Sequence, residues 1–255
     1  MDYLKTERDG DGVVLLTLNR PDKLNVLNIA LMDEMDELFR SFESDSGVKG
    51  VILTGAGEKA FAAGADISEL AALDRESGKA RAQSGQALCY RIESFPRPVI
   101  AAINGYALGG GTELALSCHL RVASREAEIG VPEITLGVIP GFGGTQRLKR
   151  LAGPATALEL ILTGDRIKAE EALRAGLVNR VSEPGQTVQE AKKLMKRILK
   201  NAPLAVTAGL RAVLDNTEDG YAHEAELFGS LCGTEDFQEG TRAFLEKRPA
   251  TFRGR

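Results

Sequence analysis

The 255-residue sequence predicts an α/β fold whose strands run mainly parallel. In its first half, apolar strand-like runs are followed by glycine-rich turns and then by stretches with helical spacing. This alternation is typical of parallel sheets, because a chain needs a long crossover to return to the same edge. After Gly137 almost every segment has helical spacing. In such folds ligands bind where strand carboxyl ends meet helix amino ends.

Four buried strands are predicted, each ended by proline, glycine or polar residues. They lie at 12–21, 48–55, 97–105 and 119–124. A helix is predicted after Asn28, a good N-cap, and another over 82–95. The first of these helices has an apolar face and an acidic face. The apolar face holds Leu31, Met35, Leu38, Phe39 and Phe42, and the acidic face holds Asp33, Glu34, Asp36 and Glu37.

The second half is predicted to contain only helices, two of which end at Gly153 and Gly176. The predicted helices span 145–153, 155–162, 168–176, 187–200, 203–215, 221–231 and 234–248. We expect residues 1–200 to form the core and residues 201–255 to form a helical appendage, a kind of segment that often docks against another subunit. Pro203 marks the soft boundary between them.

Composition excludes several classes of protein. A net charge of −4 argues against nucleic acid as the main partner. The longest apolar runs are too short for a membrane span, and the charged N-terminus does not resemble a signal peptide. Three widely spaced cysteines make a disulfide framework or a zinc site unexpected. We expect a cytoplasmic protein without a metal.

Several familiar catalytic motifs are missing or incomplete. Residues 55–60, GAGEKA, fit a dinucleotide-binding glycine pattern, but no helix or acidic partner follows as that site requires. A P-loop and a GxSxG nucleophile motif are absent from the sequence. The two histidines, His119 and His223, are interpreted as packed or surface residues, which leaves little room for a triad.

Two glycine- and alanine-rich loops, 62–66 and 109–111, remain as candidates for chemistry. Their small residues let a ligand approach the main chain, and the amino end of a helix offers unpaired N–H groups. Such donors stabilise an oxyanion, at about 3–4 kcal/mol each. We therefore interpret these loops as candidate oxyanion-binding segments.

Two glutamates lie in apolar surroundings near these loops. Glu113 follows Gly110 by one helical turn, so both fall on one helix face. Glu133 follows Pro132 in an apolar, glycine-rich loop. A single glutamate is more often solvated or salt-bridged, but two in uncharged stretches fit paired acid/base chemistry.

These segments together resemble the crotonase (enoyl-CoA hydratase/isomerase) family across nearly the whole chain. The matching stretches are AFAAGADI, PVIAAINGYALGGGTELALSC, IGVPEITLGVIPGFGGTQRL, LTGDRIKAEEALRAGLVN and FLEKR. The resemblance implies a spiral of repeated β-β-α units and a C-terminal helical trimerisation region. It also implies a coenzyme A thioester substrate, no separate cofactor, and a homotrimer or a hexamer made of two trimers.

The resemblance also assigns site residues. It implies that the N–H groups of Ala65 and Gly110 form the oxyanion hole and that Glu113 and Glu133 are the catalytic glutamates. Contacts to coenzyme A are implied for Ala63, Ala65, Asp66, Ile67 and Gly110. Gly141 is implied as a backbone donor near the catalytic water. Phe244 and Lys247 are implied to reach coenzyme A from a neighbouring subunit.

Retention of both glutamates favours hydration of a trans-2-enoyl-CoA, as in fatty acid β-oxidation or a related acyl-CoA pathway. The alternatives are a Δ3-Δ2-enoyl-CoA isomerase or a hydratase for branched or aromatic acyl groups. His119 stands where an aspartate is common in the family, which puts the local packing in question. Thr112 replaces a frequent cysteine, a mild change.

Two non-enzymatic alternatives are also considered. Lys192, Lys196 and Lys200 align on one helix face and would suit RNA, but the opposite apolar face favours an ordinary packed helix. A noncatalytic assembly protein would have little reason to keep two glutamates beside two donor loops. The sequence therefore predicts an enzyme that binds neither nucleic acid nor a membrane.

Overall fold

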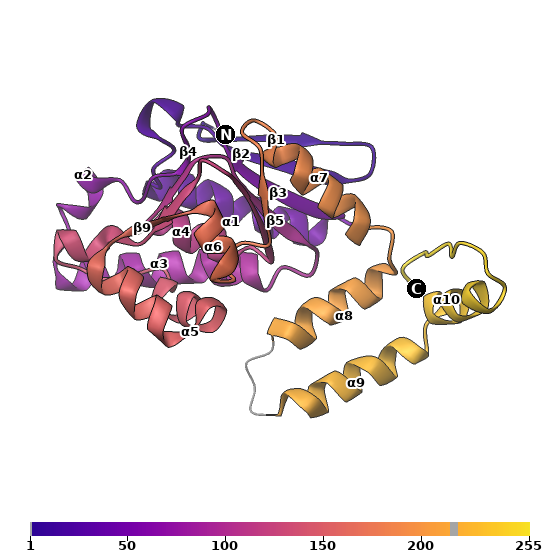
Figure 1. Ribbon diagram of the computed structural model, residues 1–255. Coiled ribbons are helices and arrows are strands. Elements are labelled where there is room, and N and C mark those ends of the chain that lie inside the picture. Colours follow the sequence, from indigo (N-terminus) through magenta and orange to yellow (C-terminus); the bar gives the residue numbers. More distant parts are fainter. Residues whose placement is uncertain (1, 215–218) are drawn as a thin grey trace.

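The computed structural model describes residues 2–214 and 219–255 and contains two sheets flanked by helices (Figure 1). The six-stranded sheet has the order β1-β2-β3-β5-β7-β10, and the four-stranded sheet has the order β4-β6-β8-β9. The six-stranded sheet consists of β1 (Leu4–Arg8), β2 (Val13–Leu18), β3 (Gly50–Gly55), β5 (Val99–Ile103), β7 (Leu120–Ser124) and β10 (Arg180–Ser182). The four-stranded sheet consists of β4 (Ala60–Ala62), β6 (Tyr106–Leu108), β8 (Glu128–Gly130) and β9 (Arg166–Lys168).

The helices of the core connect these strands. They are α1 (Ile29–Ser44), α2 (Ile67–Leu70), α3 (Arg75–Glu93), α4 (Gly110–Ser117), α5 (Gly144–Thr163), α6 (Ala169–Arg174) and α7 (Thr187–Ile198), with 3-10 helices η1 (Pro21–Lys23) and η2 (Pro132–Leu136). Asn28 caps α1 by accepting the N–H of Leu31, and the predicted apolar face of α1 is buried. Gly153 interrupts α5 with a φ of 80°, and Gly176 follows α6 with a φ of 79°, as predicted.

Strand pairing is mainly parallel, as the sequence predicts. Only β1–β2 and β8–β9 pair antiparallel among the described strands. The order β3, β4, β5, β6, then β7, β8 along the chain alternates between the two sheets, so successive turns of the chain wind as β-β-α units. The predicted α/β spiral is confirmed.

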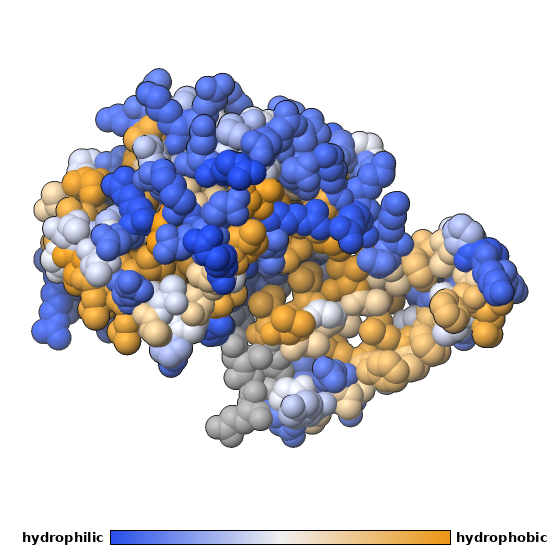
Figure 2. All heavy atoms as spheres, viewed as in Figure 1, coloured by the Kyte–Doolittle hydropathy of each residue, from blue (hydrophilic) through white to orange (hydrophobic). Residues whose placement is uncertain are grey.

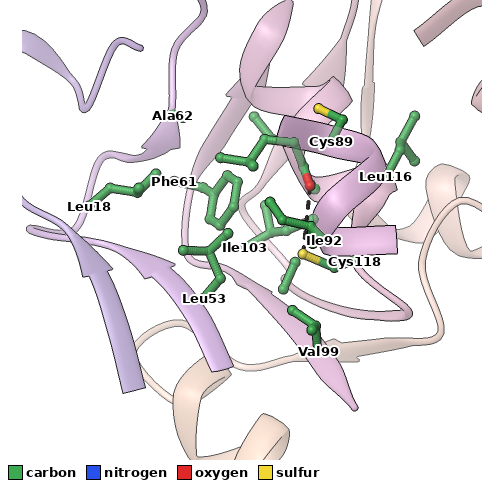
Figure 3. Close-up of a cluster of buried hydrophobic side chains, with 14 of the residues drawn as sticks. Leu18, Leu53, Phe61, Ala62, Cys89, Ile92, Val99, Ile103, Leu116 and Cys118 are labelled. Atoms are coloured by element: carbon green, nitrogen blue, oxygen red, sulfur yellow. Dashed lines mark hydrogen bonds between the residues drawn. The ribbon is translucent and has the colours of Figure 1, made fainter. Parts of the chain in front are cut away.

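The core lies between the two sheets and under α1, α3 and α4. Figure 3 shows Leu18, Leu53 and Ile103 from the large sheet packed with Phe61 of β4 and Ile92 of α3. A second, smaller cluster on the opposite face of the large sheet includes Ala191 and Met195 of α7. The apolar face of α7 is therefore packed on the sheet, as expected for an ordinary amphipathic helix.

The last three helices form an arm that projects from the core (Figure 1). They are α8 (Pro203–Leu214), α9 (Gly220–Cys232) and α10 (Glu235–Leu245). Figure 2 shows hydrophobic side chains gathered along this arm, and exposed ones include Val213, Phe228 and Phe244. The predicted end of the first arm helix at Asp215 lies outside the described residues.

The prediction of helices alone after Gly137 is wrong at β9 and β10. Each has three residues, too few for an alternating pattern to be recognised, and each exists because it pairs with β8 or β7. The short strands β4, β6 and β8, and the N-terminal β1, were likewise not predicted. The β-propensity of so few residues predicts a strand poorly, because such a strand forms only where a neighbouring strand pairs with it.

Candidate active site

The candidate groups lie at one edge of the four-stranded sheet. Strands β4, β6 and β8 are neighbours and parallel, so their carboxyl ends meet at the same edge. Ala65, Gly110 and Glu133 follow β4, β6 and β8, respectively, within three residues of each strand end. Ligand sites of α/β proteins occur at such an edge. The fold thus brings together residues that are far apart in the sequence.

The N–H of Ala65 is directed away from its neighbouring segment. Leu27 donates its N–H to the carbonyl of Gly64 (2.8 Å) and accepts the N–H of Asp66 (3.1 Å). In a parallel bridge of this kind, the residue between those two presents its own N–H and carbonyl to the other side. The N–H of Ala65 has no acceptor among residues 2–214 and 219–255.

Gly110 is the first residue of α4, so its N–H has no partner inside the helix. That N–H has no acceptor elsewhere in the described chain either. A Cβ atom on Gly110 would be 3.6 Å from the Leu27 side chain, the residue that bridges Ala65. The two free N–H groups therefore belong to loops that both pack around Leu27.

The glycine run before α4 is required by close packing. A Cβ atom on Gly111 would lie 2.0 Å from the carbonyl oxygen of Ala62, which is impossible without moving the backbone. Gly109 has a φ of 51° and a ψ of −125°, a conformation that favours glycine. These glycines let the amino end of α4 approach β4 and leave the N–H of Gly110 unobstructed.

Glu113 is buried in the first turn of α4, with 1% of its surface exposed. Its Oε1 accepts the N–H groups of Phe142 and Gly144, each at 2.7 Å. Burial raises the pKa of Glu113 to about 7, and the nearby charge of Glu133 acts in the same direction. The N–H groups of Gly144 and Phe142 and the cation of Arg147 oppose that rise. Glu113 is therefore a carboxylate that can change protonation near neutral pH.

Glu133 lies in η2, and its carboxylate rests against Gly109 at the start of α4. Its Oε2 is buried and has no hydrogen-bond partner among the described residues. Burial also raises the pKa of Glu133. A buried carboxylate oxygen without a partner is costly, and such positions are typical of sites that take a ligand or a water.

The turn at 141–144 holds Glu113 in place and was not predicted to do so. Gly144 is the first residue of α5, so Glu113 lies at a helix amino end, where a negative charge is favoured. The Phe142 ring packs against Gly85 of α3 and Gly110 of α4. The sequence contained one signal for this, the glycine-rich GFGG before a helical segment, but the partner glutamate lies 31 residues earlier than Gly144.

The predicted coenzyme A contacts fall into two groups. Ala63, Asp66 and Ile67 belong to the same segment as Ala65. The N–H of Ala63 is taken by the carbonyl of Leu24 (3.0 Å), so only its carbonyl is free to bind a ligand. The Asp66 carboxylate caps α2 and pairs with Arg20 at 3.2 Å. Ile67 is 56% exposed.

Gly141 and the two arm residues are placed differently. Gln86 donates to the carbonyl of Gly141 (2.9 Å), whereas the N–H of Gly141 has no acceptor within the described ranges. Phe244 and Lys247 lie at the end of α10 on the projecting arm, not beside α4 of the same chain (Figure 1). Phe244 is 83% exposed.

His119 is a packed residue. Its Nδ1 accepts the N–H of Val99 (2.9 Å), and its Nε2 is 3.0 Å from the carbonyl of Glu93. The imidazole thus satisfies two backbone groups at the end of α3 and the start of β5. The departure from the family's usual aspartate is therefore accommodated locally.

A family model described as enoyl-CoA hydratase/isomerase matches residues 8–255. The chain belongs to the enoyl-CoA hydratase/isomerase family. It is 47% identical over 246 residues to a short-chain-enoyl-CoA hydratase of Clostridium acetobutylicum, covering 95% of this chain and 94% of that one. It is 43% identical to a crotonyl-CoA hydratase of Syntrophomonas wolfei, with 95% of each chain covered.

Solved structures of this family have the same fold. An enoyl-CoA hydratase from Bacillus anthracis superposes with a TM-score of 0.93 at 39% identity, covering 99% of this chain and all of that one. One from Geobacillus kaustophilus also gives 0.93, at 42% identity, with 99% and 98% covered. The predicted family and an enzyme of the enoyl-CoA hydratase type are confirmed.

Other kinds of site are not found in the described part of the chain. Residues 2–214 and 219–255 contain no group of three or more His, Cys, Asp or Glu residues arranged to hold a metal ion. Within the same ranges, every helix is too short or too polar to cross a membrane. The three cysteines are free thiols, and Cys89 and Cys118 are buried.

Proposed function

We propose that this enzyme adds water reversibly and syn to a trans-2-enoyl-CoA, giving a 3-hydroxyacyl-CoA. The observation that carries the proposal is the buried Glu113 and the half-buried Glu133, whose Oε2 has no partner among the described residues, beside two unpaired backbone N–H groups at one sheet edge. The names of the similar hydratases support the substrate class.

In this proposal the N–H groups of Ala65 and Gly110 bind the thioester oxygen. Conjugation spreads the polarisation to the β-carbon of the double bond, which becomes electrophilic. Negative charge grows on the thioester oxygen as the enolate forms, so donors fixed in advance stabilise the transition state more than the ground state. The close approach permitted by Gly111 packs the amino end of α4 against β4, the strand that precedes Ala65.

The two glutamates hold one water between them. Oε1 of Glu113 is occupied by two N–H groups, which leaves Oε2 to accept a proton from the water as oxygen attacks the β-carbon. Glu133, whose Oε2 has no partner among the described residues, starts as the carboxylic acid and donates its proton to the α-carbon. The hydrated product then leaves Glu113 protonated and Glu133 ionised, and the reverse reaction returns both protons. Elevated pKa values bring both carboxylates toward the range in which proton transfer at neutral pH is efficient.

No separate cofactor is needed, because coenzyme A is part of the substrate. We assign its binding to the 63–67 segment, through the carbonyl of Ala63 and the main chain of Ala65, Asp66 and Ile67. The N–H of Gly141 is assigned to the water. Phe244 and Lys247 are assigned to coenzyme A bound by a neighbouring subunit, because they lie on the arm in their own chain.

The assembly proposed is a homotrimer, or a hexamer of two trimers. Residues 1–200 form the catalytic unit and residues 201–255 the oligomerisation region. The support is the arm of α8, α9 and α10, whose apolar side chains are exposed in the single chain. Apolar patches of this kind on a soluble domain typically mark a protein interface.

The direct test uses Glu113→Ala and Glu133→Ala, with crotonyl-CoA hydration followed by loss of enoyl absorbance. Each folded variant should lose at least about 10²-fold in kcat, the scale of a positioned acid or base. Near wild-type turnover in either folded variant contradicts the role of that residue. A wild-type enzyme that shifts the double bond of a 3-enoyl-CoA but hydrates no 2-enoyl-CoA is an isomerase. A panel of linear, branched and aromatic enoyl-CoA substrates defines the acyl preference.

A further inference from the structure

Arg147 is a buried cation beneath the turn that binds Glu113. Its side chain is 7% exposed. One guanidinium nitrogen, Nη1, donates to the carbonyl of Phe142 (2.9 Å), and the other, Nη2, pairs with the Glu93 carboxylate (2.7 Å). A Cβ atom on Gly143 would be 2.4 Å from Nη1, so the guanidinium lies directly against that glycine.

The Phe142 peptide therefore joins Arg147 to Glu113. Its N–H donates to Oε1 of Glu113, and its carbonyl accepts from Arg147. Gly144, two residues on, supplies the second N–H to the same oxygen. A shift of this turn would move both donors away from the carboxylate at once.

The position of Arg147 is unfavourable for stability. It is the fourth residue of α5, where the helix dipole disfavours a cation. Its Nε is buried and has no partner among the described residues. Buried ion pairs seldom repay their desolvation compared with apolar residues. Costs of this kind concentrate where function requires them.

We propose that Arg147 is a positioning residue for Glu113: paired with Glu93, it clamps the Phe142–Gly144 turn so that both N–H groups face the carboxylate. This inference rests on the proposed function, in which Glu113 takes the proton from water. Lysine cannot replace the clamp, because a single ammonium lacks the planar fork that reaches the carbonyl and the carboxylate together.

The charged and titratable groups around Glu113 are few. Glu133 of η2 and Arg147 of α5 act on its charge, and Cys89 of α3 is close enough for the Glu113 charge to act on the thiol. Removing the cation and loosening the two N–H bonds both favour the protonated form of Glu113. Loss of Arg147 should therefore raise the pH at which Glu113 ionises.

The test compares wild type, Arg147→Met, Arg147→Lys, Glu113→Gln and the double variant E113Q/R147M in crotonyl-CoA hydration. Arg147→Met should lower kcat at least about tenfold with little change in KM, and should move the acidic limb of kcat/KM to higher pH. Arg147→Lys should shift the acidic limb in the same direction by a smaller amount and lose less kcat, because the ammonium keeps the positive charge but not the clamp. The double variant should be no slower than Glu113→Gln alone, because Arg147 acts only through Glu113 and both changes remove the same contribution to catalysis.

Arg150→Met is the matched control. Arg150 is in the same helix and binds the same Glu93 carboxylate (2.8 Å), while the bond to the Phe142 carbonyl is made by Arg147. We expect the kcat of Arg150→Met to stay within twofold of wild type. The acidic limb of its kcat/KM profile should not move within experimental error. An equal effect of Arg150→Met would assign the loss to Glu93 rather than to the clamp.

A readout without turnover separates this inference from the proposed function. Carbon-13 NMR of glutamate carboxyls identifies Glu113 by the signal that Glu113→Gln removes, and its titration midpoint should rise in both Arg147 variants. If wild type hydrates no enoyl-CoA but this midpoint moves, the function is wrong and the clamp stands. Suppose instead that wild type is active, but in folded Arg147→Lys neither the acidic limb of kcat/KM nor the titration midpoint of Glu113 moves. The clamp is then wrong.

Discussion

The Glu133 carboxylate lies directly against Gly109, so that a Cβ atom at Gly109 would be 2.8 Å from Oε1 of Glu133. Gly109 lies between β6 and α4, and Glu133 lies in η2, which follows β8. The amino end of α4 and the Glu133 carboxylate are therefore in direct contact. A side chain at Gly109 fits only if the Glu133 carboxylate moves away.

Gly109→Ala should accordingly damage the site. The new methyl group meets Glu133, and the φ of 51° strains any other residue. We expect a fall in kcat of at least about tenfold and a loss of about 1–3 kcal/mol in unfolding free energy. Steady-state hydration and urea unfolding measure the two effects.

Gly185→Ala is the control for backbone strain alone. Gly185 also has a positive φ, 75°, but nothing lies within 4 Å of a Cβ atom there. We expect it to lose stability by about 1 kcal/mol while kcat is unchanged. Equal kcat losses in both variants would contradict the specific contact with Glu133.

The pH dependence of hydration should follow the ionisation of Glu113. Because its pKa is raised to about 7 and the mechanism needs the carboxylate, kcat/KM should fall as pH drops below about 7. The decline should approach tenfold per pH unit. A profile that is flat between about pH 5 and 8 would show that Glu113 ionisation does not control the reaction.

Packing of α3 on the Phe142 ring can be tested at a single glycine. A Cβ atom on Gly85 would be 2.0 Å from that ring, so Gly85→Ala must displace the ring or the helix. We expect a loss of about 1–3 kcal/mol in stability from overpacking, and lower kcat because the Phe142 N–H moves away from Glu113. Thermal unfolding measures the loss of stability, and steady-state hydration measures the loss of kcat.

Gly78→Ala on the same helix should have the opposite effect on stability. Nothing lies within 4 Å of a Cβ atom at Gly78. Alanine there should add about 0.5–1 kcal/mol, because it restricts the unfolded chain and favours the helix, and kcat should be unchanged. Destabilisation by Gly78→Ala would mean that α3 tolerates no side chain for reasons other than the Phe142 ring.

Two buried groups make opposite contributions to stability in acid. Burial lowers the pKa of His119 to about 4, so its contribution is complete above about pH 6.5 and is lost as pH falls toward 4. The pKa of Glu113 is raised to about 7, so its contribution is complete below about pH 4.5 and is lost as pH rises through 7. Each amounts to about 3 kcal/mol at most.

Glu113→Gln should therefore steepen the acid loss of stability between about pH 6.5 and 4.5, because it removes the opposing contribution of Glu113 and leaves that of His119. Urea unfolding at several pH values measures this slope. His119→Gln should change the slope in the other direction. Identical slopes in wild type and Glu113→Gln would contradict the raised pKa of Glu113.

Local patterns in the sequence were sufficient for much of this protein. The strands at β2, β3, β5 and β7, the Asn28 cap and the helices of the second half all follow from spacing and end signals within one segment. So does the placement of Glu113 one turn after Gly110, since both lie on α4. These features depend on neighbours a few residues away, and a sequence displays such neighbours directly.

The tertiary structure alone decided how these segments meet. The strands β4, β6, β8, β9 and β10 form only because distant partners pair with them. The bonds from Phe142 and Gly144 to Glu113 join α4 to the start of α5 across about thirty residues of chain. Close packing through glycines sets those distances, and the space between two segments is a property of the folded chain that no local pattern encodes.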